Sequence, residues 1–75
     1  MNDIITAAVA AGFPGAEIAV EVDGNRAQIT VVSPVFASMT RVRKQQAVYA
    51  CIAEHIASGA LHAVTIRALT PEEAG

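Results

Sequence analysis

Residues 36–69 read FASMTRVRKQQAVYACIAEHIASGALHAVTIRAL, and this stretch decides the fold. A stripe of mostly apolar side chains recurs there every three or four residues, which is the period of an amphipathic helix. The predicted buried stripe contains Val42, Gln45, Tyr49, Ile52 and Ile56. The opposite side, expected to face solvent, carries Arg43, Lys44, Ala47, Cys51, Glu54 and His55. We therefore predict one long helix that is capped by Thr40 and ended by Ser58 and Gly59.

After this helix the period changes to two residues, the alternation of a half-buried strand. One side of the strand is predicted to hold His62, Val64, Ile66 and Ala68, and the other Ala63, Thr65, Arg67 and Leu69. Two earlier segments alternate in the same way, through Ile18, Val20 and Val22 and then through Ala27, Ile29 and Val31. Between them lies Asp23-Gly24-Asn25, which has the composition of a tight hairpin turn. We predict three strands, the third opened by His62.

Shorter helical segments complete the predicted order. They are expected at residues 2–12, capped by Asn2 or Asp3 and ended by Gly12, and at residues 35–37, and residues 70–73 have the composition of a helix start. A crossover of about thirty residues can bring the third strand beside either hairpin strand, parallel to one of them. We expect residues 1–75 to form a single α+β domain of αββααβ order, with helices covering one face of a three-stranded mixed sheet.

Composition narrows the functional classes. The formal net charge of −2 argues against a surface drawn as a whole to nucleic acid, although a local basic patch is still compatible with it. The single Cys51 cannot form an internal disulfide, which favours a reducing cytoplasm. The apolar run at residues 4–13 is too short to span a membrane and lacks the cationic lead of a signal peptide. No nucleophile with a base, phosphate loop or complete metal-ligand set is readable, so we expect no enzyme activity.

The long helix begins with three cations, Arg41, Arg43 and Lys44. Positive charge at a helix N-terminus is unfavourable against the macrodipole, so helix stability alone explains these residues poorly. They are candidate contacts for phosphates or for an acidic partner surface, and a solvated helix end is the alternative. Cys51 and His55 are one helical turn apart and could share a metal, but packing of a small residue against a neighbour is the simpler interpretation.

Two runs, FASMTRVRKQQAVY from position 36 and LHAVTIRALTPEE from position 61, resemble the BolA family. The form RVRKQQxVY is most similar to the acidic bacterial subgroup called IbaG or YrbA. The resemblance implies a KH-like fold of the second type. It also implies partnership with a monothiol glutaredoxin, in which a [2Fe-2S] cluster is shared with a glutaredoxin cysteine and a glutathione thiol, and a second proposed activity in DNA binding. On the first of these, His62 is the cluster ligand.

The hairpin loop departs from the family pattern. Many relatives have a second ligand there, His or Cys, whereas Arg26 holds the equivalent position in this chain and an arginine offers iron no lone pair. Three hypotheses follow. The first is a glutaredoxin-binding adaptor in cluster trafficking or iron homeostasis, with no cofactor when alone. The second is a small DNA-binding regulator using Arg41, Arg43 and Lys44, and the third is an interaction module that binds glutaredoxin without a complete ligand set. Alone, we expect a monomer or weak homodimer that does not bind membranes. For His62 the alternative is a histidine packed at a strand end.

Overall fold

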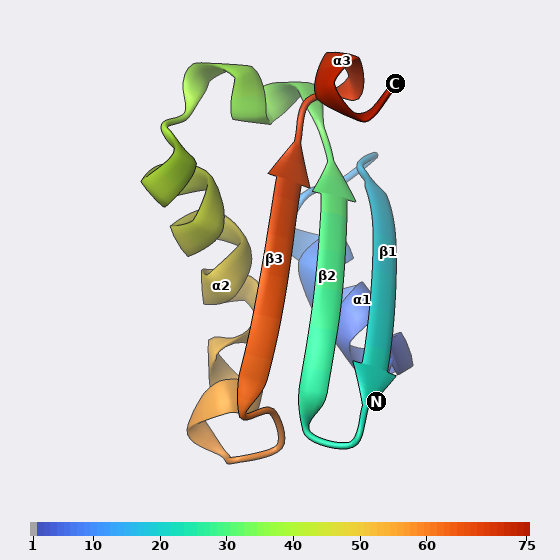
Figure 1. Ribbon diagram of the computed structural model, residues 1–75, viewed down its shortest axis with the longest axis vertical. Coiled ribbons are helices and arrows are strands. Elements are labelled where there is room, and N and C mark those ends of the chain that lie inside the picture. Colours follow the sequence, from blue (N-terminus) through green and yellow to red (C-terminus); the bar gives the residue numbers. More distant parts are fainter. Residues whose placement is uncertain (1) are drawn as a thin grey trace.

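Residues 2–75, the part of the chain that the computed structural model describes, form one sheet with helices packed against it (Figure 1). The elements in order are α1 (Asn2–Gly12), β1 (Glu17–Asp23), β2 (Arg26–Val32), the 3₁₀ helix η1 (Pro34–Ser38), α2 (Arg41–Ala57), β3 (Ala63–Leu69) and α3 (Pro71–Ala74). This is the predicted αββααβ order, followed by one short helix. None of the described helices combines the length and the apolar character needed to cross a membrane.

The sheet is mixed, with strand order β1-β2-β3. β1 and β2 pair antiparallel from Glu17↔Val32 to Asp23↔Arg26, around a turn in which Gly24 has a φ of 61°. β3 returns parallel to β2, in the register Arg26↔Ala63 to Val32↔Leu69. The crossover through η1 and α2 therefore places the third strand beside the second hairpin strand, and leaves β1 and β3 as the two edges of the sheet.

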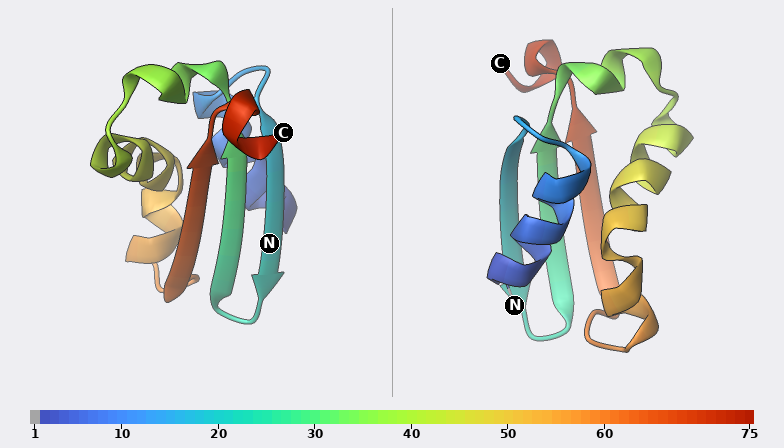
Figure 2. Two further views of the ribbon diagram at one scale, coloured as in Figure 1. Left: turned by 45° about the horizontal axis from the view of Figure 1, so that its top comes forward. Right: turned by 180° about the vertical axis from the view of Figure 1, so that it is seen from behind.

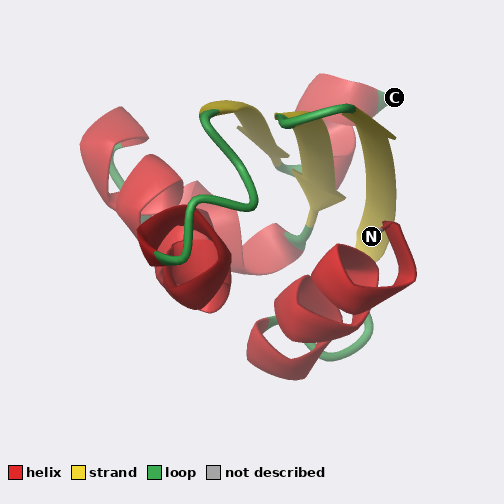
Figure 3. Cartoon of the chain, turned by 90° about the horizontal axis from the view of Figure 1, so that it is seen from below, coloured by secondary structure: helices red, strands yellow, loops and turns green. Residues whose placement is uncertain are grey.

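The core lies between one face of the sheet and the two long helices (Figures 2 and 3). Alternation along β2 turns three side chains inward and leaves their neighbours on the other, open face. The fully buried large side chains come from all the layers: Ile5, Val9, Ile29, Val31, Phe36, Val48, Ile52 and Leu61. No charged or polar residue among those described is buried, so the core is purely apolar and the predicted one-sided arrangement is confirmed.

The predicted buried face of α2 was wrong, because the face that the helix buries is rotated about its axis from the predicted stripe. Val42 and Tyr49, assigned to the buried stripe, are 63% and 46% exposed, whereas Val48 is fully buried. Gln45 is exposed too, and the residues turned partly inward instead are Lys44, Ala47, Cys51 and His55. The cause is α1, because α2 packs against that helix as well as against the sheet and rotates its contact face toward it.

Gly12 permits this close approach of the two helices. A Cβ atom placed on Gly12 would lie 2.6 Å from Cys51 Sγ, far inside van der Waals contact. The Cys51 thiol donates to the carbonyl oxygen of Ala47 at 3.5 Å. Burial raises the pKa of the Cys51 thiol, which keeps it protonated and unreactive. Cys51 is thus a packing residue of the helix pair.

The element ends follow local capping rules with one exception. Thr40 caps α2, since its hydroxyl accepts from the Arg43 amide at 3.2 Å. α1 already includes Asn2 and Asp3, so neither of them is the predicted cap. The Asn2 side-chain amide instead donates to the carbonyl oxygen of Val20 at 3.1 Å and ties the start of α1 to β1.

Candidate functional site

His62 lies in the loop between α2 and β3, directly before the strand that it was predicted to open. Its backbone amide donates to the carbonyl oxygen of Asn25 at 2.8 Å, which fixes it against the hairpin turn of β1 and β2. The preceding Leu61 is buried in the core, whereas His62 is exposed. A Cβ atom on Gly59 would lie 3.8 Å from His62 Nε2, so the ring lies beside this loop glycine. The imidazole is therefore held near one end of the sheet and is accessible.

The hairpin turn and His62 lie at the same end of the molecule, but Arg26 does not face the imidazole. The Cα of Arg26 is paired with that of Ala63, one residue after His62. Its side chain borders a shallow hollow on the open face of the sheet, together with Asp23, Gln28 and Thr65. Arg26 therefore offers the imidazole no second protein ligand.

No group of three or more His, Cys, Asp or Glu side chains within residues 2–75 is arranged to hold a metal ion. Cys51 is engaged in helix packing, and His55 is half-buried one turn further along α2. An exposed imidazole suits iron as one ligand among several. The donor set of this chain therefore fits a [2Fe-2S] cluster only where other molecules supply the remaining ligands.

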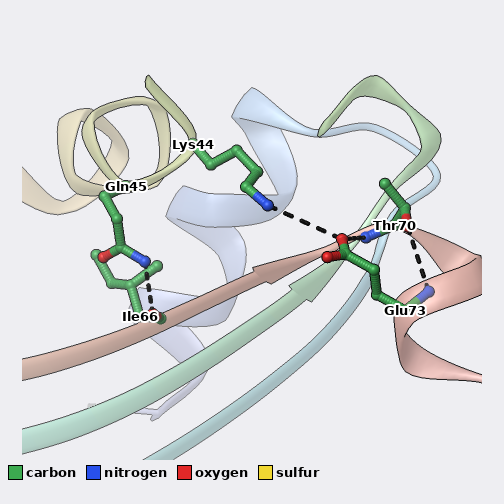
Figure 4. Close-up of polar contacts among 5 residues, drawn as sticks. All are labelled: Lys44, Gln45, Ile66, Thr70 and Glu73. Atoms are coloured by element: carbon green, nitrogen blue, oxygen red, sulfur yellow. Dashed lines mark hydrogen bonds and ion pairs between the residues drawn. The ribbon is translucent and has the colours of Figure 1, made fainter. Parts of the chain in front are cut away.

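The three cations at the start of α2 divide into two kinds. Arg41 and Arg43 are exposed and make no ion pair within residues 2–75. Lys44 is different, because its side chain is only 17% exposed and its Nζ lies 3.8 Å from Glu73 Oε1 (Figure 4). Two of the predicted contact residues are thus free for a partner, and the third joins α2 to the C-terminal helix.

Glu73 belongs to a capping box at the start of α3. Its carboxylate accepts from the Thr70 amide at 2.9 Å, and its own amide donates to the Thr70 hydroxyl at 3.3 Å (Figure 4). The backbone bond from Thr70, the side-chain bond and the Lys44 charge together lower the pKa of Glu73. The TPEE ending was predicted as a helix start, and the structure adds its tie to Lys44.

Sequence reasoning missed a second surface, a groove between α2 and β3. It is lined by Gln45, Gln46, Tyr49, Ala50, Val64 and Ile66. Tyr49 was assigned to the core and is half exposed. The available signal was the apolar stripe itself, which is wider than the face that α2 buries.

The part of the chain that the structure describes thus combines an accessible histidine with two exposed arginines, Arg41 and Arg43, on a small α+β domain. A family profile described as BolA-like protein matches residues 15–73. The chain therefore belongs to the BolA-like family, and the resemblance seen in the sequence is confirmed.

The relatives agree with this assignment. The chain is 45% identical over 72 residues to an Acinetobacter guillouiae protein from the rpoN-murA intergenic region, covering 96% of this chain and 87% of that protein. It is 46% identical over 57 residues to the acid stress protein IbaG of Escherichia coli strain K12, covering 76% of this chain and 68% of IbaG. Among solved structures, BolA1 from Arabidopsis thaliana superposes with a TM-score of 0.85 at 24% identity, over 96% of this chain and 93% of that one. That structural likeness supports the fold.

Proposed function

We propose that this chain is a non-enzymatic cytoplasmic adaptor that binds a monothiol glutaredoxin and takes part in [2Fe-2S] cluster assembly, trafficking or iron homeostasis. Membership of the BolA-like family supports the class. The observation that carries the proposal is His62, an accessible imidazole anchored through its backbone to the hairpin turn. Because this chain has no complete ligand set in residues 2–75, the adaptor needs a partner to hold a cluster.

Each part of the site has a separate task in this proposal. The Asn25 carbonyl and buried Leu61 fix the backbone on either side of the His62 amide, so the ring starts from a defined position. His62 supplies one nitrogen ligand, and the glutaredoxin cysteine and glutathione supply sulfur. When bound, the cluster would supply one-electron and transfer chemistry, with a potential raised by imidazole ligation. Arg26 lies toward the open face and adds no ligand.

The test is anaerobic co-purification with a monothiol glutaredoxin and glutathione, with cluster content and complex size read together. His62→Ala should change the visible absorption and circular dichroism of the complex. His55→Ala is the matched control, since it removes the only other histidine. An unchanged spectrum for His62→Ala would exclude His62 as a ligand. A complex of full size without cluster would instead support the simpler module that binds glutaredoxin alone.

DNA binding is the second candidate function, favoured by the exposure of Arg41 and Arg43 without ion-pair partners in residues 2–75. Lys44 is held by Glu73, so about two phosphates are expected to be neutralised. The logarithm of the DNA association constant should then fall with the logarithm of salt concentration with a slope of about −1.8, from about −0.9 per phosphate. A flat salt response, or no loss of binding in the Arg41→Ala/Arg43→Ala variant, would exclude this function.

A further inference from the structure

α2 has more apolar surface than the fold buries. Its core face is centred on Val48 and Ile52, and both side chains are fully buried. Val42 and Tyr49 project from a neighbouring face of the same helix and are 63% and 46% exposed. Large apolar side chains grouped on an exposed helix face mark a contact surface more often than isolated ones do. This second face is therefore available to another molecule.

The exposed face borders a groove whose other wall is β3. Tyr49 and Ala50 line it from the helix, and Val64 and Ile66 line it from the strand. Both strand side chains are only half-buried, although they point to the same face of the sheet as the core. The groove thus has apolar walls and runs beside the free edge of the sheet.

The backbone of β3 adds hydrogen-bonding groups to this groove. In a parallel ladder, alternate residues direct both backbone groups to the same neighbour. The Ala63 amide donates to the Asn25 carbonyl oxygen, and the Leu69 carbonyl oxygen accepts from Ser33, so the odd-numbered residues of β3 serve β2. Residues 64, 66 and 68 consequently turn their amides and carbonyls to the free edge. Gln45 Nε2 donates to one of them, the Ile66 carbonyl oxygen, at 2.8 Å (Figure 4).

Charge defines what this edge attracts. Residues 41–69 contain four Lys or Arg residues and one acid, Glu54. Residues 2–23 contain four acids and neither Lys nor Arg. Arg41 and Arg43 stand exposed at the start of α2, and Arg67 is exposed on β3 next to Ile66. Arg67 lies on the open face of the sheet, opposite Val64 and Ile66, so a strand added at this edge with its apolar side chains toward the groove directs its alternate side chains toward Arg67.

We propose that the groove between α2 and β3 binds an extended acidic segment of a partner protein, which adds to β3 as a fourth strand. Alternate apolar side chains of the segment pack on Tyr49, Val64 and Ile66, and its acids, on the other face of the added strand, lie beside Arg67. The segment's backbone replaces the Gln45 amide as the donor to the Ile66 carbonyl oxygen. In the free chain, Gln45 therefore blocks strand pairing at this edge. His62 takes no part in this contact.

The observations favour a peptide over nucleic acid. Single-stranded nucleic acid is held by several aromatic platforms and a continuous basic groove. Tyr49, on α2, is the only aromatic side chain lining this groove, and the wall formed by β3 consists of the aliphatic side chains Val64 and Ile66. A row of edge amides and carbonyls, by contrast, matches the backbone of an extended peptide.

The probe is the synthetic peptide EIAVEVD with blocked ends, which reproduces residues 17–23 and alternates acidic with apolar side chains. Tyr49 is the only tyrosine and the chain has no tryptophan, so intrinsic tyrosine fluorescence reports on this groove directly. We expect a saturable change in Tyr49 emission at low salt. The peptide KIAVKVK, with its acids replaced by lysine, should bind at least tenfold more weakly, and equal binding of the two peptides would overturn the charge argument.

Two matched variants locate the site. Ala50→Asp, at an exposed position that lines the groove, should weaken binding at least tenfold while Tyr49 remains as reporter, and Ile4→Asp, at a 55% exposed apolar position on α1, should leave affinity unchanged. Both variants are read alongside their circular dichroism to show that they fold. His62→Ala should bind normally, so failure of the cluster proposal leaves this one standing. Equal weakening by both aspartates, tighter binding of oligo(dT) at the same Tyr49 reporter, or occupation of the groove by a second copy in sedimentation would each overturn the proposal.

Discussion

At each of the two edges of the sheet a side-chain amide from a helix donates to a strand carbonyl oxygen, but the surroundings of the two edges differ. At the β1 edge the Asn2 amide bonds to the Val20 carbonyl oxygen at 3.1 Å, and at the β3 edge the Gln45 amide bonds to the Ile66 carbonyl oxygen at 2.8 Å. Each side chain comes from the helix that packs beside that strand. An edge strand with free backbone groups invites pairing, and a side-chain amide blocks it at its centre. In the isolated chain, a side-chain amide thus blocks strand pairing at the centre of both edges.

The difference lies in how the two helices pack. α1 packs beside β1, buries Ile5 and Val9 completely and has one acid, Asp3, in its first turn. α2 divides its apolar surface between α1 and the sheet, which leaves Val42 and Tyr49 outside the core, and Tyr49 lines the groove beside β3. The comparison teaches that the angle at which a helix packs can leave part of its apolar surface outside the core.

The largest expected effect separates the two faces of α2. Ile52→Ala removes a fully buried side chain and should lower the free energy of unfolding by about 2–5 kcal/mol, enough to unfold much of the population of so small a domain. Tyr49→Ala should cost less than about 1 kcal/mol, because its ring is half exposed. Urea unfolding followed by far-UV circular dichroism measures both. Similar costs for the two variants would mean that Tyr49 belongs to the core and that the groove is not an open surface.

The next effect tests the contact that rotates α2. Gly12→Ala brings a Cβ atom to 2.6 Å from Cys51 Sγ and should lower the free energy of unfolding by about 1–3 kcal/mol. Cys51→Ala removes the sulfur, so most of that cost should disappear in the double variant. Neighbouring residues in contact are expected to be non-additive in this way. Additive costs in the double-mutant cycle would show that Gly12 and Cys51 do not limit the helix approach.

These residues also mark what sequence could and could not provide. Strand alternation is a local property, so the inward side chains Ala27, Ile29 and Val31 and the TPEE helix start were predicted correctly. The angle of α2 depends on a contact between Gly12 and Cys51, nearly forty residues apart, and no local period contains it. The family motif predicted His62 as a ligand, and that stays a prediction; the place of its ring beside Gly59 and the bond from its backbone amide to the Asn25 carbonyl oxygen come from the loop geometry.

A smaller effect is expected from removing the two side-chain amides, of Gln45 and Asn2, that block the sheet edges. Gln45→Ala removes a bond that an incoming strand must displace, and a net hydrogen bond of about 0.5–1.5 kcal/mol corresponds to about two- to tenfold tighter binding of the EIAVEVD peptide. Asn2→Ala breaks the equivalent bond at the β1 edge and should not change that affinity. Tyr49 fluorescence titration reads both variants. Weaker binding by Gln45→Ala would mean that the glutamine contacts the peptide instead of guarding the edge.

The smallest effect concerns the tie between the β3 side and the C-terminal helix, for which the β1 side has no counterpart: Lys44–Glu73 is the only ion pair within residues 2–75. The pKa of Glu73 is lowered in the folded chain, first by its bond from the Thr70 backbone, then by the Thr70 side chain and then by Lys44. The folded chain therefore holds this proton less tightly than the unfolded chain. Its stabilising contribution is present above the ordinary glutamate pKa and is lost as the pH falls through the lowered value. Because the carboxylate is exposed, we expect fraying of α3 in that acidic range with little change in global stability.

The carboxyl carbon shift of Glu73 in an NMR titration measures the pKa of this carboxylate. Lys44→Met, which keeps the aliphatic stem, should raise that pKa slightly. In 1 M salt most of the lowering should persist, since hydrogen bonds are screened less than a charge pair at 3.8 Å. Complete loss of the lowering in salt would make Lys44, and not the capping box, its main cause.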